Sequence, residues 1–223
     1  MTKYIILDAG AFINLAQNSL LSIFGGLAKI FQGNFIITPG VKYEAIDHPL
    51  NIKRFEWGAL RVEHLITRGV VMESKELISD EELNGKTIEV MNKINNALFS
   101  DSKSIHLVER GESECLALSL LLKEKNIDSA VVIDERTARM LCEDPEKLRQ
   151  LMENKLHTRI KMKYDQVKDF ESIKVIRTPE LMFLARKSKL LDGDKRTFEA
   201  VLYALKFGGC SITDKEIEMM KRM

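Results

Sequence analysis

Acidic residues stand directly after two short apolar runs of the chain. The run Tyr4–Leu7 ends at Asp8, and the run Ala130–Ile133 ends at Asp134. Unbroken apolar runs of this length are expected for strands that are buried on both faces of a parallel sheet. In open α/β sheets the functional crevice lies beyond the carboxyl ends of the strands. We therefore expect the two aspartates to meet at one edge of a sheet.

Three glutamates are placed where they can join the aspartates. Glu44 lies in the first turns of the helix expected after a second strand at Phe35–Thr38. Glu112 and Glu114 lie in the first turn of a helix expected over 112–125. If that helix begins at the same edge of the sheet, four or five carboxylates converge there.

A convergence of carboxylates indicates a divalent cation. Like charges a few ångströms apart raise one another's pKa values, and a hard cation with oxygen ligands relieves this repulsion. Mg²⁺ or Mn²⁺ suits a set of ligands that lacks His and Cys. Such an ion generates hydroxide from bound water and stabilises charge on a phosphoryl oxygen. The chemistry predicted from this type of site is hydrolysis of a phosphodiester.

Each acid, taken alone, also has a structural interpretation. Asp8 and Asp134 can each act as a turn residue or as the cap of the next helix. Glu112 and Glu114 lie near the positive end of a helix dipole, whatever else they do. Glu44 alone would be read as a surface residue. The functional interpretation therefore depends on the five acids occurring together.

Four segments, taken in order, resemble the motifs of the PIN-domain nucleases. The third of them looks like the Gly-Glu-x-Glu-Ala form that is found in a prokaryotic, toxin-like branch of that family. The order and spacing of the segments along about 140 residues agree with the family. The four segments are Ile6–Leu15, Thr38–Glu44, Gly111–Leu118 and Val132–Arg139.

The resemblance implies a PIN-like three-layer α/β/α fold with a central parallel sheet, and the activity of a Mg²⁺- or Mn²⁺-dependent endoribonuclease. Asp8, Glu44, Glu114 and Asp134 would be the catalytic and metal-binding acids, with Glu112 as an auxiliary. Many members of the family are toxins that pair with an antitoxin protein, and many form homodimers. RNA, an antitoxin and a second copy of the chain are thus the partners that the resemblance implies.

Two features depart from the family pattern. The family often has Ser or Thr two residues after the first aspartate, where this chain has Gly10. The stretch 50–110 and the tail beyond residue 178 exceed the compact plan of the toxins. These additions weaken the toxin assignment more than the nuclease assignment.

The remaining patterns predict one PIN-like domain over 1–223. Its core is expected at about 1–142 and 170–191, with a helical insertion at about 50–110 and a C-terminal helical extension at about 192–223. Residues 143–169 are charged and poorly periodic. Helices are expected at Arg54–Thr67, Leu83–Leu98, 178–191 and Asp194–Phe207, and a last strand is expected at Ile173–Ile176.

Composition limits the class of protein further. The 223 residues are 45% hydrophobic and 30% charged, as in globular proteins, and the net charge is +1, so no global basic field indicates a nucleic-acid binder. Three widely spaced cysteines form no disulfide framework, which favours a reducing compartment. No apolar run approaches the roughly 20 residues that span a bilayer. We expect a soluble, cytoplasmic protein without a membrane partner.

Local basic stretches can still hold an RNA backbone. One consists of Lys155, Arg159, Lys161 and Lys163, and a second runs from Arg186 to Arg196. Phosphate neutralisation by such residues gives affinity that depends on salt and not on sequence. Lysine and arginine residues on ordinary solvent-exposed helix faces would give the same sequence pattern.

Two other functions fit the same sequence. A non-catalytic PIN-fold module would dock RNA or a protein without cutting, and Gly10 and the extra segments motivate that alternative. An acidic-site phosphatase would hydrolyse small phosphate esters and leave RNA intact.

Overall fold

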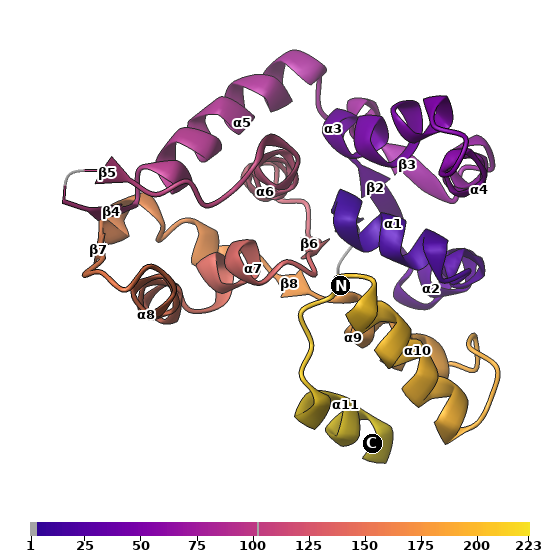
Figure 1. The fold of residues 1–223 in the computed structure, drawn as a ribbon. Helices are drawn as coiled ribbons and strands as arrows, with labels where there is room; N and C mark the ends of the chain where they lie inside the picture. Colours follow the sequence, from indigo (N-terminus) through magenta and orange to yellow (C-terminus); the bar gives the residue numbers. More distant parts are fainter. Residues whose placement is uncertain (1–3, 102) are drawn as a thin grey trace.

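A five-stranded parallel sheet forms the centre of the computed structural model, which describes residues 4–101 and 103–223 (Figure 1). The strand order is β3-β2-β1-β6-β8, and all the pairs are parallel. The strands are β1 (Tyr4–Leu7), β2 (Asn34–Ile37), β3 (Val71–Glu73), β6 (Ser129–Val132) and β8 (Val175–Ile176). The expected α/β class with a central parallel sheet is confirmed.

The middle strands are buried because both faces of the sheet are covered. Ile6 pairs with Ile36 on one side and with Val131 on the other, and all three side chains are fully buried. Apolar residues without alternation are the pattern of such a strand. The register also aligns Leu7 with Val132, so β1 and β6 end side by side.

Helices surround the sheet in an arrangement compatible with three layers. The helix α6 lies against β1 and β6 and packs on α5, whereas α2 lies against β2 and α9. The helices are α1 (Ala9–Gln17), α2 (Phe24–Phe31), α3 (Pro39–Lys42), α4 (Glu56–Thr67), α5 (Asp80–Asn95), α6 (Arg110–Glu124), α7 (Arg136–Glu143), α8 (Pro145–Leu156), α9 (Thr178–Lys187), α10 (Lys195–Phe207) and α11 (Asp214–Arg222).

The stretch 50–110 is only partly the helical excursion that the sequence suggested. It contains α4 and α5, but it also contributes β3, which pairs with β2 and forms an edge of the central sheet. The predicted limits of α5 at Leu83–Leu98 were wrong at both ends. Ser79 accepts a hydrogen bond from the amide of Glu82 and so begins the helix at Asp80. Leu98 lies in the next strand.

Residues 143–169 are more regular than their charged sequence suggested. They include α8, which begins with Asp144 as its cap and Pro145 in its first turn. They also include β7 (Lys161–Met162), which joins β4 (Leu98–Ser100) and β5 (Lys103–Ser104) in a small antiparallel sheet. This second sheet was not predicted, because its strands are too short to show a period.

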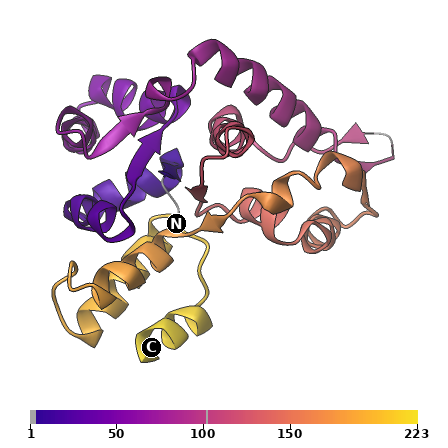
Figure 2. The same cartoon turned by 180° about the vertical axis from the view of Figure 1, so that it is seen from behind.

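The C-terminal helices pack on the core (Figure 2). The amide of Asn14 in α1 donates to the carbonyl of Leu205 in α10 at 2.9 Å. The backbone N–H of Ser211 donates to the carbonyl of Asp134 at 3.1 Å. The extension is therefore hydrogen-bonded to α1 and to the segment that follows β6.

A π-helical turn, η2 (Tyr43–Asp47), follows α3. Its widened hydrogen bond runs from the N–H of His48 to the carbonyl of Tyr43, five residues earlier, at 2.9 Å. π-helical turns of this kind are frequent at functional sites. This turn carries Glu44, and a 3₁₀ turn at Pro49–Asn51 connects it toward α4.

No single helix among the described residues is both long enough and apolar enough to cross a membrane. The segments Ala9–Gln17 and Leu21–Phe31 pass that test only as a pair, and they are bent by 110° relative to each other. Their large apolar side chains, such as Phe12 and Phe24, belong to the protein core.

Candidate acidic site at the carboxyl end of the sheet

Asp8 lies at the end of β1 and caps α1. Its Oδ2 accepts a hydrogen bond from the N–H of Gly10 at 3.2 Å, so the structural interpretation as a helix cap is correct. The residue is only 6% exposed. No cationic side chain among the described residues pairs with this carboxylate. Because a buried charge without such a partner is costly, a carboxylate that served only as a helix cap would be expected to have one.

Glu112 lies in the first turn of α6 and is coupled electrostatically to Asp8. Its Oε2 accepts a hydrogen bond from the N–H of Glu109, which caps this helix, at 2.9 Å. Burial raises the pKa of Glu112 to about 7, and the charges of Asp8, Glu135 and Glu109 add to this effect. Glu112 therefore belongs to the group of acids around Asp8.

Glu114, one half turn further along α6, is buried and well paired. Its Oε2 accepts from the N–H of Gly40 at 2.7 Å, and its Oε1 accepts from the Nε of Arg110 at 3.1 Å. A Cβ at Gly40 would lie 2.6 Å from that Oε2, so any residue other than glycine would force the Glu114 carboxylate to shift from its hydrogen bond with this backbone. Glu114 thus connects the start of α3 to α6.

Glu44 reaches the same helix from the π-helical turn. A Cβ at Gly111 would lie 2.7 Å from Glu44 Oε1, which places the Glu44 carboxylate against the first turn of α6. It accepts no hydrogen bond and forms no ion pair with the described residues. Partial burial raises the pKa of Glu44, and the charges of Glu114 and Glu109 raise it further.

The electrostatics of Asp8 indicate that these acids repel one another. Burial raises the pKa of Asp8 to about 6, and the charge of Glu44 raises it further, whereas the amides of Gly10 and Ala9 lower it. The charge of Asp134 makes a smaller contribution in the raising direction. Asp8, Glu44 and Glu112 come from three separate segments and share one uncompensated region of negative potential.

Asp134 follows β6 as predicted, but its carboxylate is fully engaged. Oδ1 accepts from the N–H of Thr178 at 2.8 Å, and Oδ2 accepts from the hydroxyl of Thr178 at 2.7 Å. Burial raises the pKa of Asp134, and these two hydrogen bonds work in the opposite direction. Thr178 begins α9, so Asp134 joins β6 to the C-terminal part of the chain.

The five predicted acids thus fall into two environments. Asp8, Glu44, Glu112 and Glu114 gather around the start of α6, whereas Asp134 is committed to Thr178 at the end of the neighbouring strand. Within residues 4–101 and 103–223, no group of three His, Cys, Asp or Glu side chains is arranged as a ready-made metal site.

Two acids that were not predicted from the sequence border the cluster. Glu109 caps α6 and Glu135 caps α7, and the charge of each raises the pKa of Glu112. The spacing of Glu109 and Glu112 is that of a capping box, and Glu135 directly follows Asp134. The capping-box spacing and the position next to Asp134 could therefore have identified Glu109 and Glu135 from the sequence alone.

The predicted basic residues lie on different parts of the surface. Lys155, at the end of α8, lines a hollow together with Glu135, so the first basic stretch begins beside the acid cluster. Lys161 and Lys163 are exposed at the small antiparallel sheet. In the second stretch, the guanidinium of Arg186 lies 4.6 Å from the ring centroid of Phe198. This arginine therefore contributes to the packing of α9 on α10.

No protein-family model, curated protein or solved structure matches this chain.

Proposed function

We propose that the protein is a cytoplasmic, Mg²⁺- or Mn²⁺-dependent endoribonuclease of the PIN type. The observation that carries the proposal is the group formed by Asp8, Glu44 and Glu112. These three carboxylates converge from separate segments at the carboxyl end of a parallel sheet, have raised pKa values, and have no cationic partner in the described parts of the chain. Such uncompensated acids are typical of functional sites.

The donor set fits a hard divalent cation. Asp8, Glu44 and Glu112 offer carboxylate oxygens only, and an ion bound there would relieve the repulsion that raises their pKa values. Glu114 and Asp134 already accept hydrogen bonds at both oxygens, so we assign them to the edge of the metal site. When bound, the ion would supply Lewis-acid activation of water and of the phosphodiester.

The chain itself would contribute positioning. Arg110 and the N–H of Gly40 fix Glu114, and Glu114 in turn holds the start of α3 against α6. That contact sets where the π-helical turn presents Glu44. The pairing of β1 with β6 holds Asp8 beside this group. A toxin role, an antitoxin partner and a homodimer are further implications of the family resemblance, and they stay predictions.

The test compares RNA cleavage by wild type, Asp8→Asn and a control. Glu63→Gln is the matched control, because Glu63 is an exposed acid on α4 outside the cluster. In Mn²⁺, wild type and Glu63→Gln should cut a fluorogenic RNA, and folded Asp8→Asn should be at least about a hundredfold slower. Calorimetric titration of Mn²⁺ into the same proteins separates metal binding from turnover. Cleavage by Asp8→Asn at the wild-type rate would overturn the assignment.

A specific observation favours a second candidate, a non-catalytic PIN-fold module that binds RNA or a protein. Two of the four acids expected to hold metal, Glu114 and Asp134, already accept a hydrogen bond from the protein at each carboxylate oxygen. Such a protein would bind RNA with a steep dependence on salt and show no turnover in Mn²⁺. Hydrolysis of a chromogenic phosphate monoester, with RNA left intact, would identify the third possibility, a phosphatase.

A further inference from the structure

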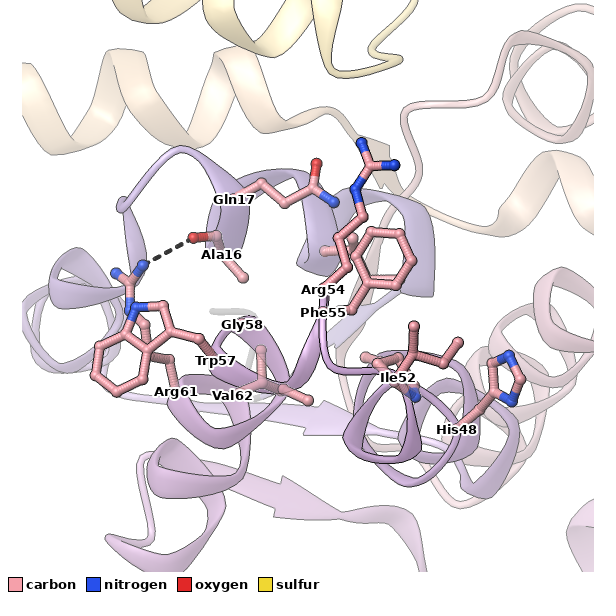
Figure 3. A pocket seen from close by; sticks show the side chains of 14 residues that line it. Ala16, Gln17, His48, Ile52, Arg54, Phe55, Trp57, Gly58, Arg61 and Val62 are labelled. Atoms are coloured by element: carbon pink, nitrogen blue, oxygen red, sulfur yellow. Dashed lines mark hydrogen bonds between the residues drawn. The ribbon is translucent and has the colours of Figure 1, made fainter.

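A hollow of about 430 Å³ lies between α1, the π-helical turn and the start of α4 (Figure 3). Ile13, Ala45, Ile52 and Val62 supply part of its apolar lining. Phe55 and Trp57, at the start of α4, also line it. The hollow is distinct from the acid cluster, and none of its lining residues is acidic.

The aromatic residues of the hollow are unusually exposed. Trp57 is 71% exposed and Phe55 is 41% exposed, and neither ring contacts another aromatic ring in the described chain. Large side chains normally bury most of their surface, because exposing them forfeits the hydrophobic stabilisation. Two exposed rings beside one concave surface are therefore available to pack against a ligand.

The charge of the hollow points to an anionic ligand. Its two fully charged lining residues, Arg54 and Arg61, form no ion pair with any carboxylate in the described chain. The guanidinium of Arg54 lies 5.4 Å from the ring centroid of Phe55. Arg61 donates to the carbonyl of Ala16 and to the hydroxyl of Ser19 at 3.1 and 3.3 Å, which holds it at the rim. Glu56 is paired with Lys53 at 3.0 Å.

The hollow adjoins the acid cluster through two elements. Ala45, in its lining, directly follows Glu44. Asp8 caps α1, and Ile13 of the same helix lines the hollow, which corresponds to about 8 Å along the helix axis. His48 also lines it, and its ring lies 5.9 Å from that of the exposed Tyr43. One extended ligand can therefore contact both places.

We infer that this hollow is a stacking subsite for unpaired bases of RNA, with Arg54 and Arg61 holding the flanking phosphates. Exposed aromatic rings beside unpaired cations are the combination that binds single-stranded nucleic acid without reading its sequence. The inference rests on the proposed function for the choice of RNA, and it makes the substrate single-stranded next to the acid cluster. An apolar protein surface would match the rings but would leave both arginines without an anionic partner.

The experiment uses Trp57 as its own probe, since it is the single tryptophan of the chain. A short oligoadenylate is titrated into the full chain in EDTA, and tryptophan fluorescence is recorded. The expected result is quenching by the oligoadenylate and little quenching by inorganic polyphosphate of equal charge, because only the former carries bases. Equal quenching by both ligands, or binding of RNA without quenching, would overturn the inference.

Variants make the same test quantitative through the anisotropy of labelled oligoadenylate. Trp57→Ala should weaken binding about tenfold, and Trp57→Phe, which keeps a ring, should recover most of the affinity. Arg54→Gln should weaken binding and flatten its salt dependence, unlike Arg222→Gln on the distant α11. Affinities unchanged by Trp57→Ala and Arg54→Gln would contradict the subsite.

The design also separates this inference from the proposed nuclease. Quenching in EDTA without cleavage in Mn²⁺ would leave the subsite standing and remove the nuclease. Cleavage in Mn²⁺ without quenching in EDTA would leave the nuclease standing and remove the subsite. Should the protein instead be a dimer that Trp57→Ala converts to a monomer, with no quenching by RNA, the hollow is an interface between two copies and the inference is overturned.

Discussion

Asp8 and Asp134 occupy matching places after the neighbouring strands β1 and β6, yet their surroundings are opposite. Asp134 has both carboxylate oxygens satisfied by Thr178, which begins a helix of the C-terminal part. Asp8 is held only by backbone amides at the start of α1, chiefly the N–H of Gly10, and faces the charge of Glu44. The same residue type at the same kind of position therefore serves stability in one place and leaves capacity for a ligand in the other. Four changes test this contrast.

Removing the Asp134 carboxylate should cause the largest loss of stability. Asp134→Ala leaves the buried N–H and hydroxyl of Thr178 without acceptors, which should lower the free energy of unfolding by about 3 kcal/mol. Urea unfolding in EDTA measures this, with exposed Asp192→Ala as the control. A loss below about 1 kcal/mol would mean that Thr178 finds other partners.

Neutralising Asp8 should act in the opposite direction. Its pKa of about 6, raised from 3.8, means that the ionised form is disfavoured in the folded protein. Asp8→Asn should therefore raise the free energy of unfolding by about 3 kcal/mol at pH 8 in EDTA, because the buried charge is removed. Mn²⁺ should stabilise wild type and leave the variant unchanged. Destabilisation of the metal-free variant would show that Asp8 is a structural acid like Asp134.

The pH dependence should identify the same group. Because folding raises the pKa of Asp8 from 3.8 to about 6, its contribution to stability is present below pH 3.8 and is lost as the pH rises through about 6. The stability of wild type relative to Asp8→Asn should fall by about 3 kcal/mol as the pH rises through that window. Glu112 is present in both proteins, but the charge of Asp8 contributes to its raised pKa of about 7, so the difference becomes constant only above the pKa of Glu112. A flat difference across the window would contradict the buried charge.

A substitution at Gly10 should have the smallest effect and should make Asp8 more like Asp134. A Cβ there would lie 3.3 Å from Asp8 Oδ2, so the hydroxyl of Gly10→Ser has a carboxylate within reach. We expect the pKa of Asp8 to fall and stability at pH 8 to rise by no more than about 1 kcal/mol. Gly10→Ala, which has no donor, is the control, and NMR titration of the Asp8 carboxyl is the measurement. An equal pKa in both variants would exclude the hydrogen bond.

The sequence predicted those features of Asp8 and Asp134 that depend on neighbouring residues in the chain. Apolar runs marked β1 and β6, and the acids that end them had to lie near the carboxyl edge of a parallel sheet. The partner of Asp134 could not be predicted, since Thr178 is 44 residues away and comes close only through the pairing of β6 with β8. Thr178 and Pro179 were recognised only as the start of a helix.

The roles of Glu112 and Glu114 illustrate a second limit of sequence reasoning. Two residues apart on α6, they point in different directions, so only one can face Asp8. The family resemblance favoured Glu114, whereas in the structure Glu114 is paired with Gly40 and Arg110, and Glu112 is coupled to Asp8. Which face of a helix meets the sheet depends on tertiary packing, which the spacing of the motif does not contain.

The π-helical turn at Tyr43–Asp47 sets the separation between Glu44 and the hollow that His48 lines. It holds one residue more than an α-helical turn would, between Glu44 in the acid cluster and His48 in the aromatic hollow. Deleting one residue there would convert the turn to α-helix and rotate the hollow relative to the acids, with no side chain changed in either. If one RNA strand occupies both the proposed subsite and the acid cluster, the length of this turn sets which of its phosphates lies at the acids.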